Sequence, residues 1–308
     1  MSNTLKTVLP ALLFCCSFIE AHSQYYFYNE HYREPGIVLD AGLLVGGMNA
    51  ITDIGGNRKT AKEPISSFTV YNTKWVGGVF LSGTYKDRFA ARLQYSLGTI
   101  EGADSLTANI NDRKAKGRAS RNLSYKTSLK ELSLCFEIHP DFLWRSPLNE
   151  PSKLSPYLLL GIGWLHYSPQ ANFEGNWIDL PPLRLEGQGF AEYPDRKPYN
   201  QNAISIPLGA GVRYELSPLM YVRAEAAFHI TNTDYLDDVS QEEYIDPALF
   251  YKYLSPNDAA LATQLFNRSK KNTSTHIELD GARGSANSKD QFWTVALHFG
   301  LVLNRKRI

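Results

Sequence analysis

Phe292–Asn304 reads FWTVALHFGLVLN, and its residues alternate between two chemical classes. Large apolar side chains fall on one face of an extended chain: Trp293, Val295, Leu297, Phe299, Leu301 and Leu303. Small or polar residues fall on the other face: Thr294, Ala296, His298, Gly300 and Asn304. This period of two predicts a β-strand with one apolar face. A strand of a water-soluble β-sandwich would show the same period, so the rest of the chain must decide what covers that face.

Seven further stretches of the chain repeat this alternation. They cover residues of about 37–48, 75–85, 89–100, 125–139, 157–167, 203–216 and 221–231. Their lengths match the roughly 9–11 residues that a tilted strand needs to cross a bilayer. Nothing else in the chain could cover the recurring apolar face, so lipid is expected to cover it. The sequence therefore predicts an all-β fold, an eight-stranded antiparallel transmembrane β-barrel with a polar interior.

The connections between these strands alternate in length. Tight turns are expected at Lys86-Asp87 and Ser217-Pro218, a moderate connection at Pro140–Leu154, and long polar connections elsewhere. Outer-membrane barrels have short periplasmic turns and long extracellular loops, so both termini are expected in the periplasm. In the longest loop, residues 232–290, the stretch Pro247–Arg268 has helical spacing, which predicts a small helical cap.

The beginning of the chain is typical of an export signal. Lys6 supplies a positive charge, Val8–Ile19 an apolar segment, and Ala21-His22-Ser23 the small residues that precede cleavage. We therefore expect a signal peptide over residues 1–23. A lipoprotein signal and a buried N-terminal segment are the alternatives.

The bulk composition of the whole chain limits the classes of function and fold that it can have. The 308 residues carry a formal net charge of +1 and a mean hydropathy of -0.30. This balance gives no field that would favour nucleic acid, and no run of about 18 apolar residues could form a membrane helix. Removal of the signal leaves Cys135 as the one thiol, so no internal disulfide can form. Residues 24–308 are expected to form a single barrel domain.

Charged residues of both signs occupy inward positions on the sixth and seventh predicted strands. A hairpin centred on Leu219 would place each arginine opposite the glutamate of the other strand. The expected pairs are Arg213 with Glu225 and Arg223 with Glu215. The interior of an eight-stranded barrel is about wide enough for side chains alone, so these pairs are expected to plug it. A charge-selective pore is the alternative.

Three aspartates lie together in the run Thr233–Ser240: Asp234, Asp237 and Asp238. Closely spaced carboxylates can bind calcium, but this spacing does not match an EF-hand loop and no glycine makes the sharp turn. A solvated, partner-facing or hydrogen-bonded acidic loop is expected instead, with no metal site.

One catalytic alternative exists in the sequence. His229 and His298 could form a hydrolase triad with Ser205 or the loop aspartates, but a triad needs a convergent geometry that spacing does not supply. Cys135 is expected to face inward beside two glutamates, which disfavour its thiolate. The chain has no P-loop, dinucleotide fingerprint, zinc spacing or basic tract with interleaved aromatic residues. We expect no catalytic residue, no cofactor and no nucleic-acid partner.

Several local runs also carry a family resemblance. They are GGMNAITDIGG at 46–56, ISIPLGAGVRY at 204–214, the acidic run 233–240, PAL at 247–249, NDAALA at 257–262, Arg283-Gly284, and DQFW at 290–293. In order and spacing they resemble the PorG-like outer-membrane β-barrels of Bacteroidetes, a family of unknown function that includes a component of the type IX secretion system. The resemblance covers most of the mature chain. The long outer loops and the basic tail Asn304–Ile308, which lacks an aromatic last residue, depart from typical members.

The resemblance implies a non-enzymatic barrel in the outer membrane of a Gram-negative bacterium. Its partners would be outer-membrane lipid and, for the secretion component, the periplasmic PorK–PorN ring. We therefore expect an anchor of a type IX secretion assembly. A surface-binding barrel that uses its long extracellular loops and a narrow channel through the charged lumen are the alternatives.

Overall fold

All eight predicted strands are present in the computed structural model, which describes residues 32–33, 35–55, 72–107, 119–140, 153–269, 283–285 and 289–307. Their bounds are β2 Ile37–Ile51, β3 Lys74–Tyr85, β4 Phe89–Ala103, β5 Ser124–Ile138, β6 Leu154–Phe173, β8 Asn202–Ser217, β9 Met220–Thr231 and β10 Gln291–Val302. The predicted signal peptide and most of the Pro140–Leu154 connection lie outside the described residues.

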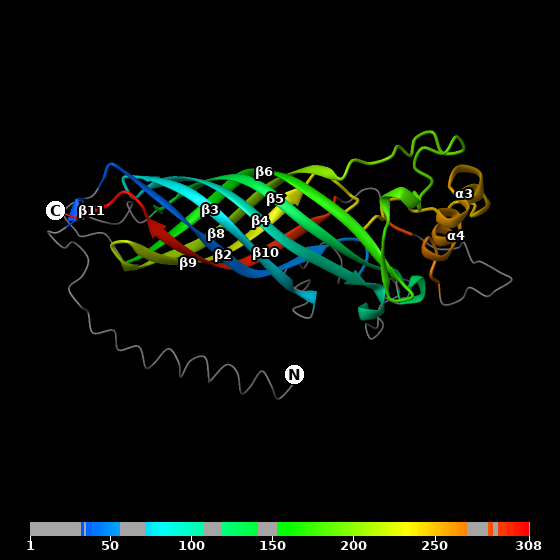
Figure 1. The fold of residues 1–308 in the computed structure, drawn as a ribbon, viewed down its shortest axis with the longest axis horizontal. Helices are drawn as coiled ribbons and strands as arrows, with labels where there is room; N and C mark the ends of the chain where they lie inside the picture. The colour runs from blue at the N-terminus through cyan, green and yellow to red at the C-terminus, as the bar shows by residue number, and fades with distance from the viewer. Residues whose placement is uncertain are drawn as a thin grey trace, which may run out of the picture.

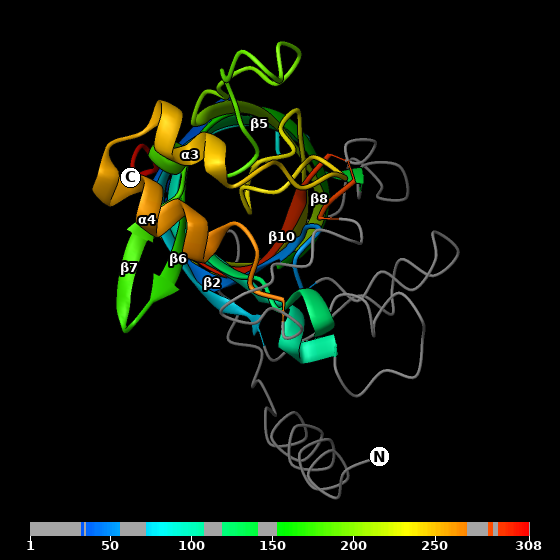
Figure 2. The same cartoon turned by 90° about the vertical axis from the view of Figure 1, so that its right-hand side faces the viewer.

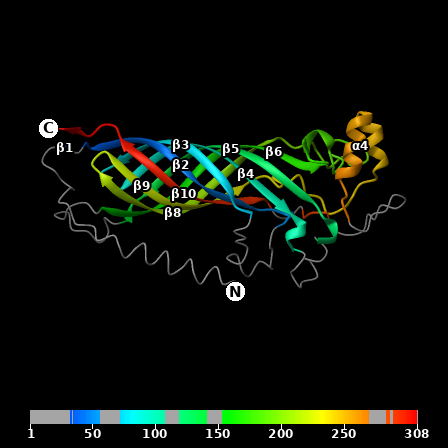
Figure 3. The same cartoon turned by 60° about the horizontal axis from the view of Figure 1, so that its bottom comes forward.

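The strands form one closed antiparallel barrel, as predicted. Their order is β5-β4-β3-β2-β10-β9-β8-β6, and a further pairing of β5 with β6 closes the ring. Figure 1 shows the barrel from the side, and Figure 3 shows how strongly the strands tilt against its axis. The first long strand, β2, pairs with the last, β10, from Asp40–Val302 to Ile51–Gln291.

The barrel has a turn end and a loop end, as the connection lengths predict. At the turn end, Lys86, Asp87 and Arg88 join β3 to β4. Lys86 and Asp87 have φ of 48° and 55°, the positive values that a type I′ hairpin turn requires. A second tight turn joins β8 to β9, where Ser217 pairs with Met220. A two-stranded sheet of β1 (Tyr32–Arg33) and β11 (Lys306–Arg307) also lies at this end.

The loop end carries a folded cap that contains the predicted helices. α3 spans Ala248–Tyr253 and α4 spans Pro256–Leu265, with Ser255 accepting a hydrogen bond from the Asp258 amide at the start of α4. The smaller elements of this end are the strand β7 (Asn176–Asp179) and the 3-10 helices η3 (Asp104–Thr107) and η5 (Pro181–Leu183). Figure 2 looks into the loop end and shows α3 and α4 over the β6 side of the ring. No helix among the described residues is long and apolar enough to span a membrane.

β6 is longer than predicted because it leaves the apolar band. Its alternation of apolar outward residues ends near Trp164, yet its ladder with β5 continues to the pair Lys126–Gln170. β6 ends at Phe173, where it turns into β7 and supports the cap. Hydrophobic periodicity predicts only the part of a strand that has an apolar face, so the predicted strand ends before the observed one.

The outer face of the barrel is apolar on every strand. Exposed large apolar side chains include Leu43, Leu81, Leu93, Phe136, Leu160, Leu208, Met220 and Leu297, one from each strand of the ring. The prediction was wrong for Trp293, which is only 9 % exposed. Trp293 lies near the loop end of β10, opposite Asn49 and Phe228, where other parts of the protein cover it.

Inward glycines make room for aromatic rings inside the barrel. Gly300 lies directly opposite Tyr221 on the neighbouring strand, and a Cβ at Gly300 would collide with the Tyr221 ring. Gly211 stands in the same relation to Tyr157. Covering a strand glycine with an aromatic ring from the next strand is a known means of stabilising sheets.

The interior is packed along its length. Near the turn end, Val38, Phe80, Tyr221 and Val302 form one buried cluster. Toward the loop end a larger cluster includes Leu44, Met48, Ile100, Leu129, Leu165 and Phe292. The cap has its own core, which includes Leu183, Phe190, Ile245, Phe250, Ala262 and Phe266.

Candidate functional site

Two arginines and one glutamate form the centre of a buried ion network in the lumen. Arg223 on β9 donates from Nη1 to both Glu137 oxygens, each at 2.9 Å. Arg92 on β4 lies 3.2 Å from Glu137 Oε1. The three side chains are at most 1 % exposed. Because buried charges are stable only when they are paired, each of these groups depends on the others.

Further polar groups extend the network across the lumen. Arg92 Nη2 donates to Glu225 Oε2 at 2.7 Å, and the Tyr157 hydroxyl donates to the same oxygen at 2.8 Å. His298 accepts at Nδ1 from Arg92 at 3.2 Å. Inward residues of β4, β5, β6, β9 and β10 are thereby joined into one hydrogen-bonded unit.

A third carboxylate lies at the edge of this unit, near the turn end. The Tyr221 hydroxyl donates to Asp40 Oδ1, and Arg223 Nη2 lies 3.9 Å from the same oxygen. The guanidinium of Arg213 stacks over the Tyr221 ring, 4.0 Å from its centroid. Charge and ring stacking therefore hold this side of the lumen together.

The predicted charge pairs of the β8–β9 hairpin are wrong, although all four side chains line the lumen. The ladder shifts between Glu215 and Ser217, so that Arg213 lies opposite Arg223 and Glu225 lies opposite Gly211. A slip of two residues keeps every side chain on its face and changes only its partner, so side-chain periodicity could not detect it. Arg213 instead pairs along its own strand with Glu215 at 3.3 Å, and Arg305 lies 3.6 Å from Glu215.

The observed partners of Arg223 and Glu225 are Asp40, Arg92 and Glu137, which reach into the lumen from β2, β4 and β5. They lie on strands that are not sequence neighbours of the hairpin, so only the closed ring brings them together.

A second polar group in the lumen contains the residues of the hydrolase alternative. Ser205 donates to Glu131 Oε1 at 2.5 Å, and His229 Nδ1 lies 3.0 Å from the same oxygen. Glu131 therefore lies between the serine and the histidine, whereas a triad needs the histidine between the nucleophile and the acid. His298 is bonded to Arg92, in the ion network and not in this group.

The acidic run 233–240 enters the mouth of the barrel. We call this segment the loop plug; in Figure 2 the yellow chain that follows β9 crosses the mouth of the ring. Its Leu236 and Val239 are at most 1 % exposed and belong to the apolar cluster inside the barrel. The Leu236 carbonyl accepts from Thr127 Oγ1 at 2.5 Å, and its amide donates to Asp290 Oδ2 at 2.9 Å.

The three predicted aspartates of the plug are buried. Asp237 accepts from the amides of Ile54 and Val239, at 2.9 and 3.0 Å. Asp238 accepts from the Tyr199 hydroxyl at 2.5 Å. Of the expected alternatives, the hydrogen-bonded loop describes this segment. No group of three or more His, Cys, Asp and Glu residues within the described ranges is arranged to hold a metal ion.

Two buried arginines connect the other loops to the plug. Arg121 donates to both oxygens of Asp104 at 2.8 Å, and to the carbonyls of Asp53 and Arg283. Arg283 donates to Glu186 at 3.1 Å. The same Glu186 oxygen accepts from the amides of Ser240 and Gln241 in the plug region, each at 3.0 Å. Sequence reasoning missed Arg121 and Glu186, and noted Arg283 only as part of a family motif.

Burial raises the pKa values of the plug carboxyls. It raises the pKa of Asp237 to about 8, with the Asp53 carboxyl adding to the shift. Burial also raises the pKa of Asp234 and the pKa of Asp238, each to about 7. The pKa of Asp290 is raised well above its usual range, by burial and then by Asp237 and Asp234. These acids therefore bind protons near neutral pH, unlike exposed aspartates.

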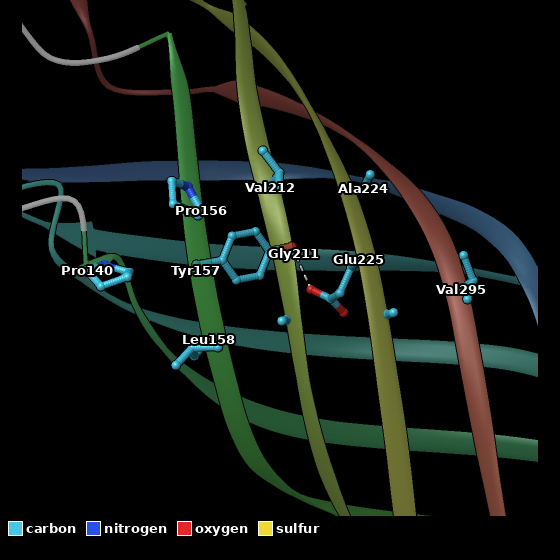
Figure 4. A pocket seen from close by; sticks show the side chains of 11 residues that line it. Pro140, Pro156, Tyr157, Leu158, Gly211, Val212, Ala224, Glu225 and Val295 are labelled. Atoms are coloured by element: carbon cyan, nitrogen blue, oxygen red, sulfur yellow. Dashed lines mark hydrogen bonds between the residues drawn. The ribbon is translucent and has the colours of Figure 1, made fainter. Parts of the chain in front are cut away.

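A pocket of about 490 Å³ lies at the wall near the turn end (Figure 4). Its lining is Pro140, Pro156, Tyr157, Leu158, Ala210, Gly211, Val212, Ala224, Glu225, Ala226 and Val295. Figure 4 shows the Tyr157 ring directed at Glu225, to which its hydroxyl is bonded. The rest of the lining is apolar or small, so the pocket is a depression in the apolar wall.

The first part of the chain matches a known protein family. Residues 26–176, slightly under half of the chain, match the model described as a domain of unknown function, DUF6089. No curated protein matches the chain.

Three solved structures are similar to the chain. Neisserial surface protein A (NspA) has 7% sequence identity and a TM-score of 0.36, with 87% of this chain and 98% of that chain covered. The N-terminal β-barrel domain of Pseudomonas aeruginosa OprF has 10% sequence identity and a TM-score of 0.32, with 88% of this chain and 100% of that chain covered. Ail, the attachment invasion locus protein of Yersinia pestis, has 9% sequence identity and a TM-score of 0.32, with 87% of this chain and 97% of that chain covered. These likenesses do not indicate what this chain binds.

Proposed function

We propose that this protein is an integral outer-membrane barrel that anchors a protein assembly, and that it neither conducts ions nor catalyses a reaction. The observation that carries the proposal is the continuous filling of the lumen. Paired charges near the turn end, the group around Glu131, the apolar cluster and the loop plug follow one another along the barrel. A barrel filled in this way offers lipid its outside and other proteins its two ends.

The outer surface supports membrane insertion. Aromatic side chains favour the two interfaces of a bilayer. Tyr85 is exposed at the turn end of β3. Trp75, the most exposed large apolar side chain among the residues that the structure describes, lies about ten positions away on the same strand. On β6 the exposed Trp164 lies about ten positions from Leu154 at the turn end. This separation matches the length of strand that crosses a bilayer.

The ion network argues against a channel. Arg92, Arg223 and Glu137 lie inside the barrel, are almost fully buried and contact one another directly. Ion passage would require these pairs to separate in a low-dielectric lumen, at a high cost in free energy. We expect purified protein to give no conductance in planar bilayers. Steady single-channel openings from the folded barrel would contradict this part of the proposal.

The resemblance to PorG-like barrels supports one kind of assembly, the type IX secretion system. In that system the turn end would face the periplasm and contact a PorK/PorN-like ring. Lys86 and Arg88 are exposed in the β3–β4 turn, which makes them suitable positions for a photo-crosslinking amino acid. Tyr251, exposed on α3 at the opposite end, is the matched control.

Crosslinking in living cells, followed by mass spectrometry, tests the anchor. We expect a periplasmic ring protein to be captured from the turn position and not from Tyr251. Recovery of correctly folded barrel without any partner from several turn positions would count against a secretion anchor.

A second candidate function is surface binding through the cap, and the separate core of the cap supports it. A loop that served only to connect strands would not need buried residues such as Phe250 and Phe266. Replacing residues 247–268 with a short Gly/Ser linker separates the two functions. If the cap is a binding module, the replacement abolishes surface binding and keeps ring capture. If the protein is only an anchor, the replacement changes neither, because the ring contacts the turn end.

A further inference from the structure

The loop plug is held by groups whose charge depends on pH. We propose that it is a proton-controlled closure: its carboxyl groups keep it in the barrel mouth while they are protonated, and loss of their protons releases it. The proposal concerns the loop end and does not rest on a secretion role.

Acids outnumber cations around the plug. The plug itself contributes Asp234, Asp237 and Asp238. Tyr235 also belongs to the plug, and the charged and titratable groups that face it from other elements are Asp53, Asp104, Glu186, Asp290, Arg121, Arg283, Lys289, Tyr125, Tyr167 and Tyr199. Both buried arginines already bind other acids, Arg121 to Asp104 and Arg283 to Glu186. Lys289 acts on Asp234 only against the larger effect of burial, and no plug carboxyl forms a direct ion pair within the described residues.

Asp234 is the clearest case within the plug. Its side chain is 2 % exposed, and neither carboxylate oxygen has a hydrogen-bond partner among the described residues. An ionised carboxylate in that position would be destabilised by burial, and the Ser240 side chain and Lys289, which favour the charged form, offset only part of that cost. A protonated carboxyl removes most of that penalty. Its burial therefore favours the neutral form, in agreement with a pKa of about 7.

The direction of the pH effect follows from proton linkage. The released plug has carboxyls with pKa values of about 3.9, whereas in the closed plug burial raises them to about 7 or 8. Between these values the closed form binds more protons than the open form, so closure weakens as pH rises. Each proton changes the closing equilibrium by about tenfold per pH unit in that window, and above it the effect levels off.

Distance measurements between two nitroxide labels test the closure. One label replaces Glu242, an exposed residue just after the plug, and the other replaces Asn202, an exposed residue at the loop end of β8. Both are introduced as unnatural amino acids into the full barrel in lipid vesicles. At about pH 5 we expect one narrow distance distribution. At about pH 9 we expect a second, broad population, increased by at least about tenfold.

Amide variants identify the responsible groups. Asp234→Asn removes a charge without removing a hydrogen bond, so it preserves folding better than changes at Asp237, which accepts two amides. We expect Asp234→Asn to reduce the pH response and the triple change of Asp234, Asp237 and Asp238 to asparagine to abolish it, with the plug closed at both pH values. Asp195→Asn, at an exposed position, is the matched control and should respond as the unaltered chain does.

Two results would overturn the proposal. One is an identical distance distribution at both pH values in the unaltered barrel. The other is an undiminished pH response in the triple variant, which would assign the control to other groups.

Discussion

Arg92 on β4 and Glu225 on β9 are joined at 2.7 Å, although their strands stand four positions apart in a ring of eight. The pair therefore spans the full width of the lumen. Tyr157 and His298 add contacts to the same two side chains. A bond of this kind ties opposite walls together and makes the interior a structural element.

Removing one member of this pair should destabilise the barrel strongly. Arg92→Met would leave Glu225 and Glu137 with less compensation in a buried site, and such losses cost about 3–5 kcal/mol. The double variant Arg92→Met with Glu225→Met should recover part of that loss, because it removes the unpaired charge as well. Urea unfolding in lipid vesicles, followed by tryptophan fluorescence, measures both. A single variant that lost less than about 1 kcal/mol would show that the pair is unimportant.

The Gly300–Tyr221 contact predicts a second effect. Gly300→Ala would place a methyl group in the Tyr221 ring, and overpacking of this kind costs about 1–3 kcal/mol. Gly83→Ala is the matched control, because a Cβ there lies 3.5 Å from Leu39 in ordinary contact. The same unfolding measurement should separate the two variants. Equal stabilities would mean that Tyr221 moves aside without cost.

If the proposed membrane insertion is right, the apolar outer surface predicts a cost of charge that depends on depth. Leu297 is exposed near the middle of β10 and Trp75 near the loop end of β3. We expect Leu297→Arg to cost about 2–4 kcal/mol in a bilayer and Trp75→Arg only about 0–1 kcal/mol. If water surrounds the outer face, the two variants should lose equally little stability. Equal losses would therefore contradict membrane insertion.

The Arg283–Glu186 pair predicts how the cap is held. Arg283→Met would leave Glu186 buried without its cation, so the plug region and the cap should loosen together. Limited proteolysis should then cut within residues 240–269 faster than in the unaltered barrel. Lys252→Met, which breaks an exposed ion pair with Glu192, should leave the cleavage rate unchanged. Unchanged cleavage in Arg283→Met would show that the apolar core of the cap holds it alone.

Alternation along the sequence was sufficient to predict the barrel, because lipid and lumen impose opposite requirements on successive residues. It placed Arg213, Glu215, Arg223 and Glu225 on the inner face, and helical spacing over residues 247–268 located the cap. It could not identify the partner of Arg213, since a register slip of two residues leaves the alternation intact. It also failed for Trp293, whose burial depends on neighbouring parts of the protein.

The loop plug lay beyond sequence reasoning for a different reason. Its contacts join residues as distant as Ile54 and Asp237, or Thr127 and Leu236. The sequence pattern showed three clustered aspartates, which are usual in a solvated loop. The chain segments that bury these aspartates come together only when the ring is closed.

The ladder between β2 and β10 also constrains the order of events during synthesis. It joins the first long strand to the last, so no shorter version of the chain can complete its ring. Contacts so distant in sequence slow folding, because a long stretch of chain must be ordered before they form. Until β10 has emerged, β2 keeps an unpaired edge, which invites aggregation. We therefore expect the unfinished chain to aggregate more readily than the complete one unless its early strands are shielded until β10 arrives.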